Sequence, residues 1–327
     1  MNPLDVELLR LLRASAVHLP AADLAAQLRV PRAHVEARLD ALRAAGFEIE
    51  KHPSLGCRLL VAPDRLIADD LKARLGECAL IRDIVVFEET DSTNDRAAQL
   101  GRQGIAGGIA IFAERQTAGR GRFGRRWESA AHRGLWFSLL LRPALPMALW
   151  PRLTTWAATG IAAGIEQATG LSARIKWPND IHLAGRKVAG ILTETVSDPG
   201  GAPFAIVGIG VNVNHESSDF PASLAGSATS LRIAAGRALD RAALAAAIFH
   251  SLAARFAALA EDFAALVAEA EERSVLLGQW IEVRAAESIL AGAAAGLDSE
   301  GRLLLRGADG SVRALTAGEV TILARTL

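Results

Sequence analysis

The chain has 327 residues, more than one domain usually holds, so its length predicts two or three domains. It is 51% hydrophobic and 22% charged, with 36 basic and 36 acidic residues, which is typical of a globular protein and excludes a polyelectrolyte. Two distant cysteines exclude a disulfide framework, and charges interrupt the alanine-rich tract near residues 240–273. We therefore expect a cytoplasmic protein with no secretion signal and no membrane span.

The first sixty residues predict three short helices followed by a hairpin. Leucines recur at helical spacing over residues 4–12, a second helix covers 22–28, and a third opens at Pro31 and ends before Gly46. Extended runs at 47–51 and 57–61 form the hairpin. This order is typical of a winged helix-turn-helix, which we place at residues 1–62, with a helical linker at 63–80.

The region 81–273 predicts a mixed sheet with helices on one side, because its apolar strands often follow one another directly. The expected strands are 84–88, 109–113, 134–141, 173–176, 187–194 and 204–213. The expected helices are 93–103, 149–169 and one long helix over about 241–272. Residues 274–327 hold short β-like runs at 280–284, 301–305, 312–315 and 320–323, which predict a small barrel. The fold class is therefore α+β.

The segment from Glu114 to Trp127 is the most informative part of the sequence. Its fourteen residues contain five arginines, three glycines and two aromatic residues, directly after an apolar strand. Glycines let the backbone wrap a ligand, and arginines bind phosphate and carboxylate. The match of residues 119–124 to a dinucleotide fingerprint is rejected, because no apolar helix follows it. A solvated basic loop that touches nucleic acid is the alternative.

Lysine placement gives a second signal, since only four of the 36 basic residues are lysines. Lys176 and Lys187 lie within twelve residues of each other, in segments that read Lys-Trp-Pro-Asn-Asp and Lys-Val-Ala-Gly. A compact ammonium is chemically distinct from the arginine fork, so the cluster favours a functional site. An ion pair of Lys187 with Asp180 or Glu194 would give the same pattern.

Two further segments have both a structural and a functional interpretation. Asp91-Ser-Thr-Asn94 supplies standard N-cap residues, and a helix N-terminus can also hold polar parts of a ligand. Gly208-Ile-Gly-Val-Asn212 ends an apolar strand, where glycines mark a bulge or the close approach of a ligand.

Taken in chain order, these segments resemble the biotin–protein ligase family over roughly residues 85–325. With the helical segment in front, the chain is similar to the bifunctional class, whose members also repress biotin synthesis. The resemblance implies a central sheet like that of class II synthetases and a C-terminal barrel of the SH3 type. It further implies that ATP and Mg²⁺ convert biotin to biotinyl-5'-AMP, and that biotin then passes to a lysine of a biotin carboxyl carrier protein.

The resemblance also implies the roles of individual residues. Lys187, Arg122 and Asp180 would be catalytic: Lys187 would draw the biotin carboxylate to the α-phosphate, and either Asp180 or desolvation would favour the neutral acceptor lysine. The biotin site would consist of Ser92, Thr93, Asn94, Gln116, Gly119, Arg120, Gly121, Arg122, Trp127, Lys187, Gly190, Gly208 and Gly210. The nucleotide site would consist of Arg122, Arg125, Lys176, Asn179, Asp180, Lys187 and Asn212, with no resident metal.

The sequence departs from the family pattern at two places. Phe123 stands where some members carry another basic residue. Residues 215–230 contain no tryptophan to cover the adenine, and small residues such as Ala228 would take its place.

DNA binding by residues 1–60 is expected to be weak or conditional, because this segment contains eight basic and seven acidic residues and so has little net positive charge to neutralise phosphates. The candidate contacts on the presumed recognition helix are Arg32, His34 and Arg38. A homodimer would double these contacts. The competing functions are a lipoate–protein ligase and a regulator that senses a ligand without catalysis.

Overall fold

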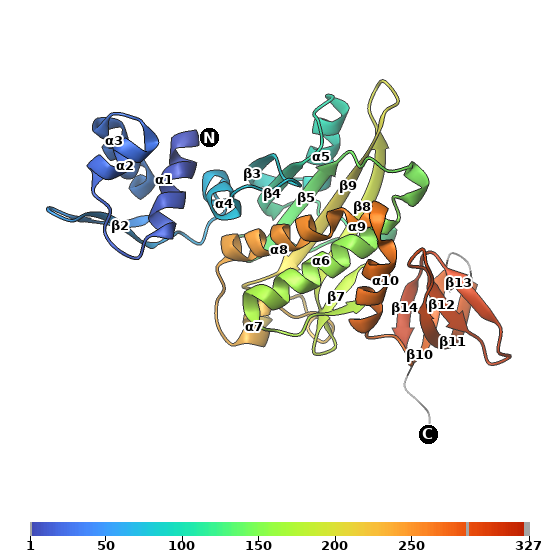
Figure 1. Cartoon of the computed structure of the whole chain (residues 1–327). Helices are drawn as coiled ribbons and strands as arrows, with labels where there is room; N and C mark the ends of the chain where they lie inside the picture. The colour runs from blue at the N-terminus through green and yellow to red at the C-terminus, as the bar shows by residue number, and fades with distance from the viewer. Residues whose placement is uncertain (1, 286–287, 324–327) are drawn as a thin grey trace. The chain divides into compact units, whose positions relative to one another are not determined.

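The computed structural model describes residues 2–285 and 288–323 (Figure 1). The chain divides into two compact units, one of Met1–Glu77 with Asp240–Ala246 and the other of Cys78–Leu239 with Ala247–Leu327.

The N-terminal unit contains the three predicted helices and the predicted hairpin. They are α1 (Pro3–Ala14), α2 (Ala21–Leu28), α3 (Arg32–Ala44), β1 (Glu48–His52) and β2 (Gly56–Val61). The Asn2 side chain caps α1 by accepting from the backbone N–H of Leu4, and leucines such as Leu8, Leu9 and Leu39 fill the core. The expected linker contains α4 (Ala68–Leu75), which packs against α1.

The second unit is built on a seven-stranded sheet of order β3-β4-β5-β9-β8-β7-β6. Only β3 and β4 pair in parallel, so the predicted mixed sheet is confirmed. The strands are β3 (Asp83–Thr90), β4 (Ile109–Gln116), β5 (Gly134–Leu141), β6 (Arg174–Lys176), β7 (Asp180–Leu183), β8 (Arg186–Ser197) and β9 (Pro203–Asn212). The strand β7 was not predicted, because the sequence interpretation placed no strand between residues 176 and 187.

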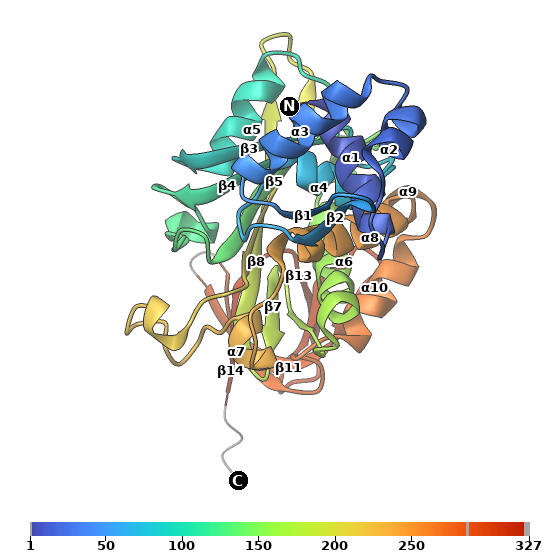
Figure 2. The ribbon, with the colours of Figure 1, turned by 90° about the vertical axis from the view of Figure 1, so that its left-hand side faces the viewer.

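The prediction of helices on one side of the sheet is wrong. Helices cover both faces, with α5 (Thr93–Arg102) on one side and α6 (Arg152–Thr169) and α8 (Arg241–Phe256) on the other (Figure 2). Strand side chains alternate between the two faces. Phe112 and Phe137 therefore pack on Phe249 of α8, whereas Ile111 and Leu140, which point to the other face, pack with α5.

The predicted long helix over 241–272 is wrong as a single helix. The chain forms α8, α9 (Ala258–Glu261) and α10 (Phe263–Glu272), with a break at Asp262. The Asp262 side chain accepts from the backbone N–H of Ala265 and so starts a new helix.

Residues 241–261 are long and apolar enough to cross a membrane, but half of the apolar stretch is buried within the protein, as in a core helix.

The C-terminal part is a five-stranded antiparallel sheet of order β13-β12-β11-β10-β14. Its strands are β10 (Trp280–Ala285), β11 (Ser288–Leu297), β12 (Leu303–Arg306), β13 (Val312–Leu315) and β14 (Glu319–Ile322). Trp177 from the central sheet region joins its core and donates its indole N–H to the Gly301 carbonyl. The remaining short elements are η1 (Arg122–Gly124), η2 (Met147–Leu149), η3 (Ser217–Asp219) and α7 (Leu231–Ala235).

Candidate active site

A cavity of about 430 Å³ opens on the face of the central sheet that carries α5. Strand register explains its lining: Trp136 pairs with Gly210, Ser138 with Gly208, and Gly190 with Gly210, so these positions share one face. Of the ligand residues expected from the sequence, the cavity is lined by Ser92, Thr93, Asn94, Gln116, Arg120, Gly121, Arg122, Arg125, Trp127, Lys176, Asn179, Asp180, Lys187, Gly190, Gly208, Gly210 and Asn212.

Gly119 is the expected ligand residue that does not line the cavity. Its carbonyl accepts from the backbone N–H of Trp127, and a Cβ atom at position 119 would lie 2.7 Å from the Trp127 carbonyl oxygen. Gly119 therefore brings the two ends of the loop together.

The N-terminus of α5 places three polar residues at the cavity. Ser92, Thr93 and Asn94 are almost fully buried, and Ser92 occupies the N-cap position without a side-chain capping bond. Thr93 donates its backbone N–H to Oε1 of Gln116 at 2.8 Å, which joins α5 to the end of β4. The residues expected to bind a polar ligand group are thus held together before any ligand enters.

The glycines of β8 and β9 make room for Trp127. A Cβ at Gly190 would lie 2.7 Å from Cζ3 of the indole, and a Cβ at Gly210 would lie 2.5 Å from Cε2. The indole N–H is buried, and no described residue accepts its hydrogen bond. Gly208 instead makes room for Asn94, whose Oδ1 would lie 2.2 Å from a Cβ. Side chains of the protein itself therefore occupy the space beside these three glycines, which accounts for the lack of a larger residue at each position.

Lys187 and Asp180 lie side by side on β8 and β7. The Nζ of Lys187 is 2.8 Å from Oδ1 of Asp180, and 5.2 Å from the centroid of a Trp127 ring. The ion pair considered from the sequence is thus present, and both of its members line the cavity. An ammonium of this kind can pull two anionic groups together at the cavity wall.

Three arginines of the loop are each held by a different segment of the chain. Arg120 donates to Asp95 of α5, Arg122 donates to Asn179 at 2.9 Å, and Arg125 donates to Glu319 of β14. Burial lowers the pKa of Arg122, although a guanidinium stays charged at neutral pH. The hydrogen bond from Arg125 lowers the pKa of Glu319. An anionic ligand would have to compete with these contacts.

Two aromatic residues after β9 were missed by the sequence interpretation. His215 and Phe220 stack with ring centroids 5.2 Å apart and line the cavity beside Ala228. Burial lowers the pKa of His215 to about 4, so the ring is neutral at physiological pH. The phenylalanine supplies an apolar surface in the segment that lacks a tryptophan, and a search of residues 215–230 for any aromatic residue would have found it.

The cavity also has a wall from the C-terminal sheet, formed by residues 318–321. This wall was not expected, because about 90 positions separate it from the nearest other lining residue, Ala228. Among the described residues, no group of three or more His, Cys, Asp or Glu side chains could hold a metal ion.

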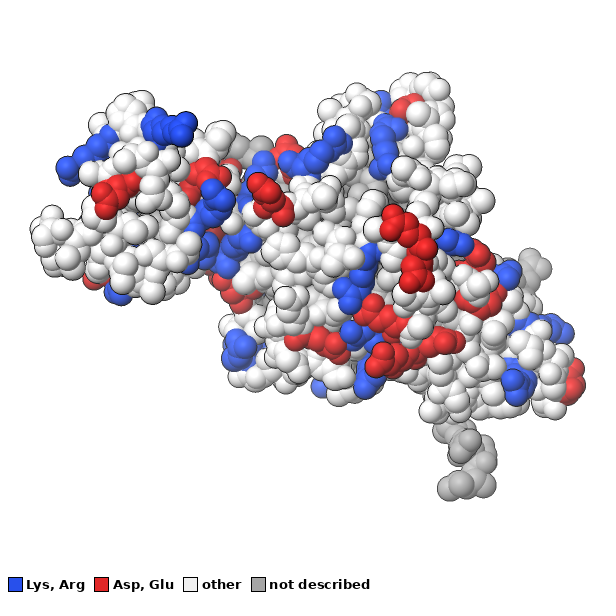
Figure 3. Space-filling view, in the orientation of Figure 1, with Lys and Arg blue, Asp and Glu red and all other residues white. Residues whose placement is uncertain are grey.

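The candidate DNA contacts lie on α3 in the N-terminal unit. Arg38 donates to the buried carboxylate of Asp5 at 2.7 Å, and Arg32 donates to Glu36 at 2.8 Å. On the face seen in Figure 3, basic and acidic side chains of this unit are interspersed. Two of the three candidate side chains are therefore paired within the domain.

Comparisons with known proteins give a consistent result. The Biotin/lipoate A/B protein ligase family model matches residues 86–214, and the Biotin protein ligase C terminal domain model matches residues 276–323. The bifunctional ligase/repressor BirA of Bacillus subtilis (strain 168) is 35% identical over 85% of this chain and 86% of its own length. The biotin–[acetyl-CoA-carboxylase] ligase of Mycobacterium tuberculosis is 31% identical over 73% and 88%, respectively. The structure of a biotin protein ligase from Aquifex aeolicus in complex with biotin and ATP matches with a TM-score of 0.65 and 29% identity, over 74% of this chain and 99% of that one.

Proposed function

The chain belongs to the biotin–protein ligase family, and we propose that the cavity on the α5 face is where it acts. It is an ATP-dependent ligase that activates biotin as an adenylate and transfers it to a protein. One observation carries the assignment of the site: the Lys187 ammonium lies on the wall of the same cavity as the N-terminus of α5, Gln116 and the arginine loop.

In the first step, a biotin carboxylate oxygen attacks the α-phosphorus of ATP and pyrophosphate leaves. Lys187 would bind both the carboxylate and the α-phosphate, which reduces their repulsion and stabilises the charge that develops on the phosphoryl oxygens. Arg122 adds a second cation at the cavity, and its partial burial strengthens its interaction with an anion. Loop closure over the adenylate would exclude water that could hydrolyse it.

In the second step, the neutral amine of an acceptor lysine attacks the biotinyl carbonyl and AMP leaves. Lys187 would polarise that carbonyl, and Asp180, which lies 2.8 Å from Lys187 at the cavity wall, would accept a proton from the incoming ammonium. The acceptor we propose is a biotin carboxyl carrier domain, which agrees with the name of the Mycobacterium tuberculosis relative.

A magnesium ion would enter this site with ATP. Mg²⁺ in nucleotide sites uses one or two carboxylates together with phosphate oxygens and water. Asp180, at the cavity wall beside Asn179, fits that donor set. When bound, the ion would neutralise charge on the leaving pyrophosphate.

The function is tested by incubating the chain with labelled biotin, ATP and a biotin-carrier domain. We expect label on the carrier, and pyrophosphate exchange that depends on biotin. Exchange that depends on lipoate instead would identify a lipoate–protein ligase, which the shared family model also covers. Binding of biotin with no exchange would identify a sensor without catalysis.

The N-terminal unit has the element order of a winged helix-turn-helix, and we propose that it binds the operator of biotin-synthesis genes only conditionally. The pairing of Arg38 with Asp5 and of Arg32 with Glu36 supports weak binding by a monomer. A homodimer formed with biotin and ATP would raise the affinity. A gel shift with the promoter, with and without both ligands, tests this; tight binding by the unliganded monomer contradicts it.

Two finer features of the protein are also proposals. The five antiparallel strands of residues 280–322 support an SH3-like barrel. Trp177, from the central sheet region, packs in the core of these strands and so connects them to the central sheet. A cytoplasmic location agrees with substrates that are ATP and a carrier protein, and fractionation of cells that express the chain would test it.

A further inference from the structure

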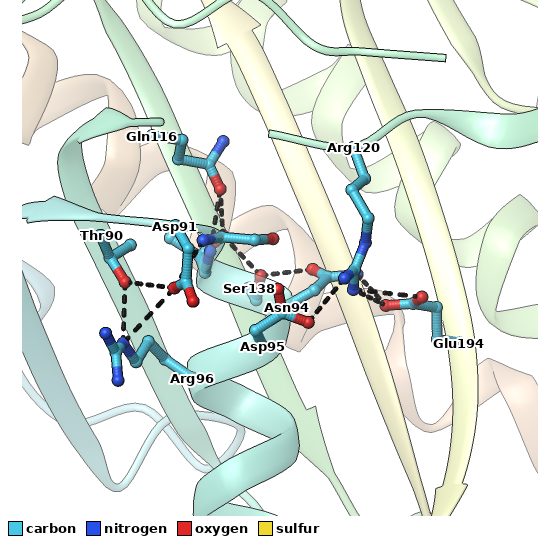
Figure 4. Close-up of polar contacts among 11 residues, drawn as sticks. Thr90, Asp91, Asn94, Asp95, Arg96, Gln116, Arg120, Ser138 and Glu194 are labelled. Atoms are coloured by element: carbon cyan, nitrogen blue, oxygen red, sulfur yellow. Dashed lines mark hydrogen bonds and ion pairs between the residues drawn. The ribbon is translucent and has the colours of Figure 1, made fainter. Parts of the chain in front are cut away.

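Glu194 is a carboxylate on β8 whose role the catalytic assignment leaves open. It is placed on the cavity side of the sheet by its register with Ile206, which packs with α5. Its Oε2 accepts from Nδ2 of Asn94 at 2.5 Å, and its two oxygens lie 3.2 and 3.4 Å from Nη2 of Arg120 (Figure 4). Glu194 thus joins a buried amide of α5 to an arginine of the ligand loop.

Asn94 continues this contact into the sheet. Its Oδ1 lies 2.5 Å from the hydroxyl oxygen of Ser138, which is fully buried on β5. The same hydroxyl lies 2.7 Å from the hydroxyl oxygen of Thr93. Gly208 opposite leaves space for the Asn94 amide, because a Cβ there would lie 2.2 Å from its Oδ1. A continuous polar chain therefore runs from Glu194 through Asn94 and Ser138 to Thr93.

The charge of Glu194 fixes the direction of every hydrogen bond in this chain. An ionised carboxylate only accepts, so Asn94 must turn its NH₂ group toward Glu194 and its oxygen toward Ser138. An amide oxygen cannot donate, so the single proton of Ser138 points to Asn94. The Ser138–Thr93 contact is then a hydrogen bond only if Thr93 donates. The hydroxyl proton of Thr93 then goes to Ser138 at 2.7 Å in preference to Oε1 of Gln116 at 3.2 Å, and its remaining oxygen lone pair can accept from a ligand.

We propose that Glu194 is a positioning residue of the biotin site: it orders the protons of Asn94, Ser138 and Thr93 so that Thr93 accepts an N–H of the ligand. The inference rests on the proposed function, which puts biotin in this cavity, and deepens it. A cyclic urea carries two N–H donors, which matches an acceptor at the cavity wall. The amide and the two hydroxyls of this network are buried, so a ligand that does not match them leaves polar groups unpaired, which raises specificity.

Glu194→Gln is the sharpest test, because an amide at this position can either accept from Asn94 or donate to it. The donor and acceptor directions of the hydrogen bonds from position 194 to Thr93 are then no longer fixed, whereas the size of the side chain stays the same. We expect the KM for biotin in pyrophosphate exchange to rise about tenfold, with kcat changed less than twofold, since the network holds the ligand and does not touch the reacting atoms. An unchanged biotin KM overturns the proposal.

Two further variants separate the polar chain from the arginine contact. Asp95→Asn weakens the 2.6 Å contact of Arg120 with α5 but leaves Glu194 and Asn94 in place, so its biotin KM should stay near that of the wild type. An equal rise in Asp95→Asn would show that Glu194 acts through Arg120 and would overturn the proposal. Glu89→Gln is the matched control, since Glu89 pairs with Arg115 outside the cavity lining.

A double-variant cycle with Thr93→Val tests the end of the chain. If Glu194 acts through the Thr93 hydroxyl, Glu194→Gln adds less than twofold to the biotin KM once that hydroxyl is gone. A full tenfold effect in the Thr93→Val background overturns the proposal. Pyrophosphate exchange by the wild type that does not respond to biotin would contradict the proposed function itself. In that case titration calorimetry with biotin alone still compares the biotin affinity of Glu194→Gln with that of the wild type.

Discussion

The indole of Trp127 fills the space beside Gly210, where a Cβ atom would lie 2.5 Å from its Cε2. The two residues come from different segments, the arginine loop and β9, and they meet on the face of the sheet that lines the cavity. The position of the loop is therefore tied to the absence of a side chain at 210.

Gly210→Ala should displace Trp127, because the added methyl group overlaps the indole. We expect strain of about 1–3 kcal/mol in the free energy of unfolding and a biotin affinity that is lower by tenfold or more. Thermal unfolding and biotin titration measure the two effects. Gly226→Ala is the control, since a Cβ there meets no atom within 4 Å. Equal behaviour of the two variants would contradict this packing argument.

Lys187→Ala should reduce biotin-dependent pyrophosphate exchange by about 10²–10³-fold, because it removes the ammonium that faces both anions. Lys51→Ala removes a lysine that pairs with Asp40 in the N-terminal unit and should leave the exchange rate unchanged. A Lys187→Ala variant with wild-type exchange would refute the catalytic assignment.

Glu319→Gln should strengthen ATP binding, because Arg125 is then no longer paired with a carboxylate. An exposed ion pair contributes about 0.2–1 kcal/mol, so the KM for ATP should fall by no more than about fivefold. Glu300→Gln breaks the pair with Arg152, away from the cavity, and should not change it. A rise in the ATP KM of Glu319→Gln would show that the pair supports the bound state.

His215 should make the fold sensitive to mild acid. Burial lowers its pKa from 6.5 to about 4, so between these pH values the unfolded chain binds a proton that the folded chain does not. The free energy of unfolding should therefore decrease by about 3 kcal/mol as the pH falls through this window. Chemical unfolding at several pH values should show a smaller decrease for His215→Phe, which keeps the stacked ring. An equal decrease in the free energy of unfolding of the wild type and of His215→Phe would contradict the argument that buried His215 causes it.

Much of the fold could be predicted from local patterns. Apolar periodicity and glycine or proline boundaries gave the three N-terminal helices and most strands of the central sheet. The strand β11 was missed because residues 291–296 are alanine and glycine, which carry no β-branched signal. The break at Asp262 was missed because one capping aspartate is hard to distinguish from a charge on a continuous helix.

The candidate site could likewise be predicted only in part. The motif segments could be found because their residue types are unusual in this chain, above all Lys187 among so many arginines. Their pairings could not, since Arg125 and Glu319 are 194 positions apart and only the fold brings them together. Ser138 offered a signal that was not used: it is the single polar side chain in the strand GLWFSLLL.

Residues 318–321 contribute to the cavity wall, so the site is complete only when this distant segment is present. A ribosome that has synthesised everything up to residue 317 has already produced Lys187, the arginine loop and the N-terminus of α5, but not the last wall that encloses them. A polypeptide cut before residue 318 would thus expose any adenylate it formed to hydrolysis by water.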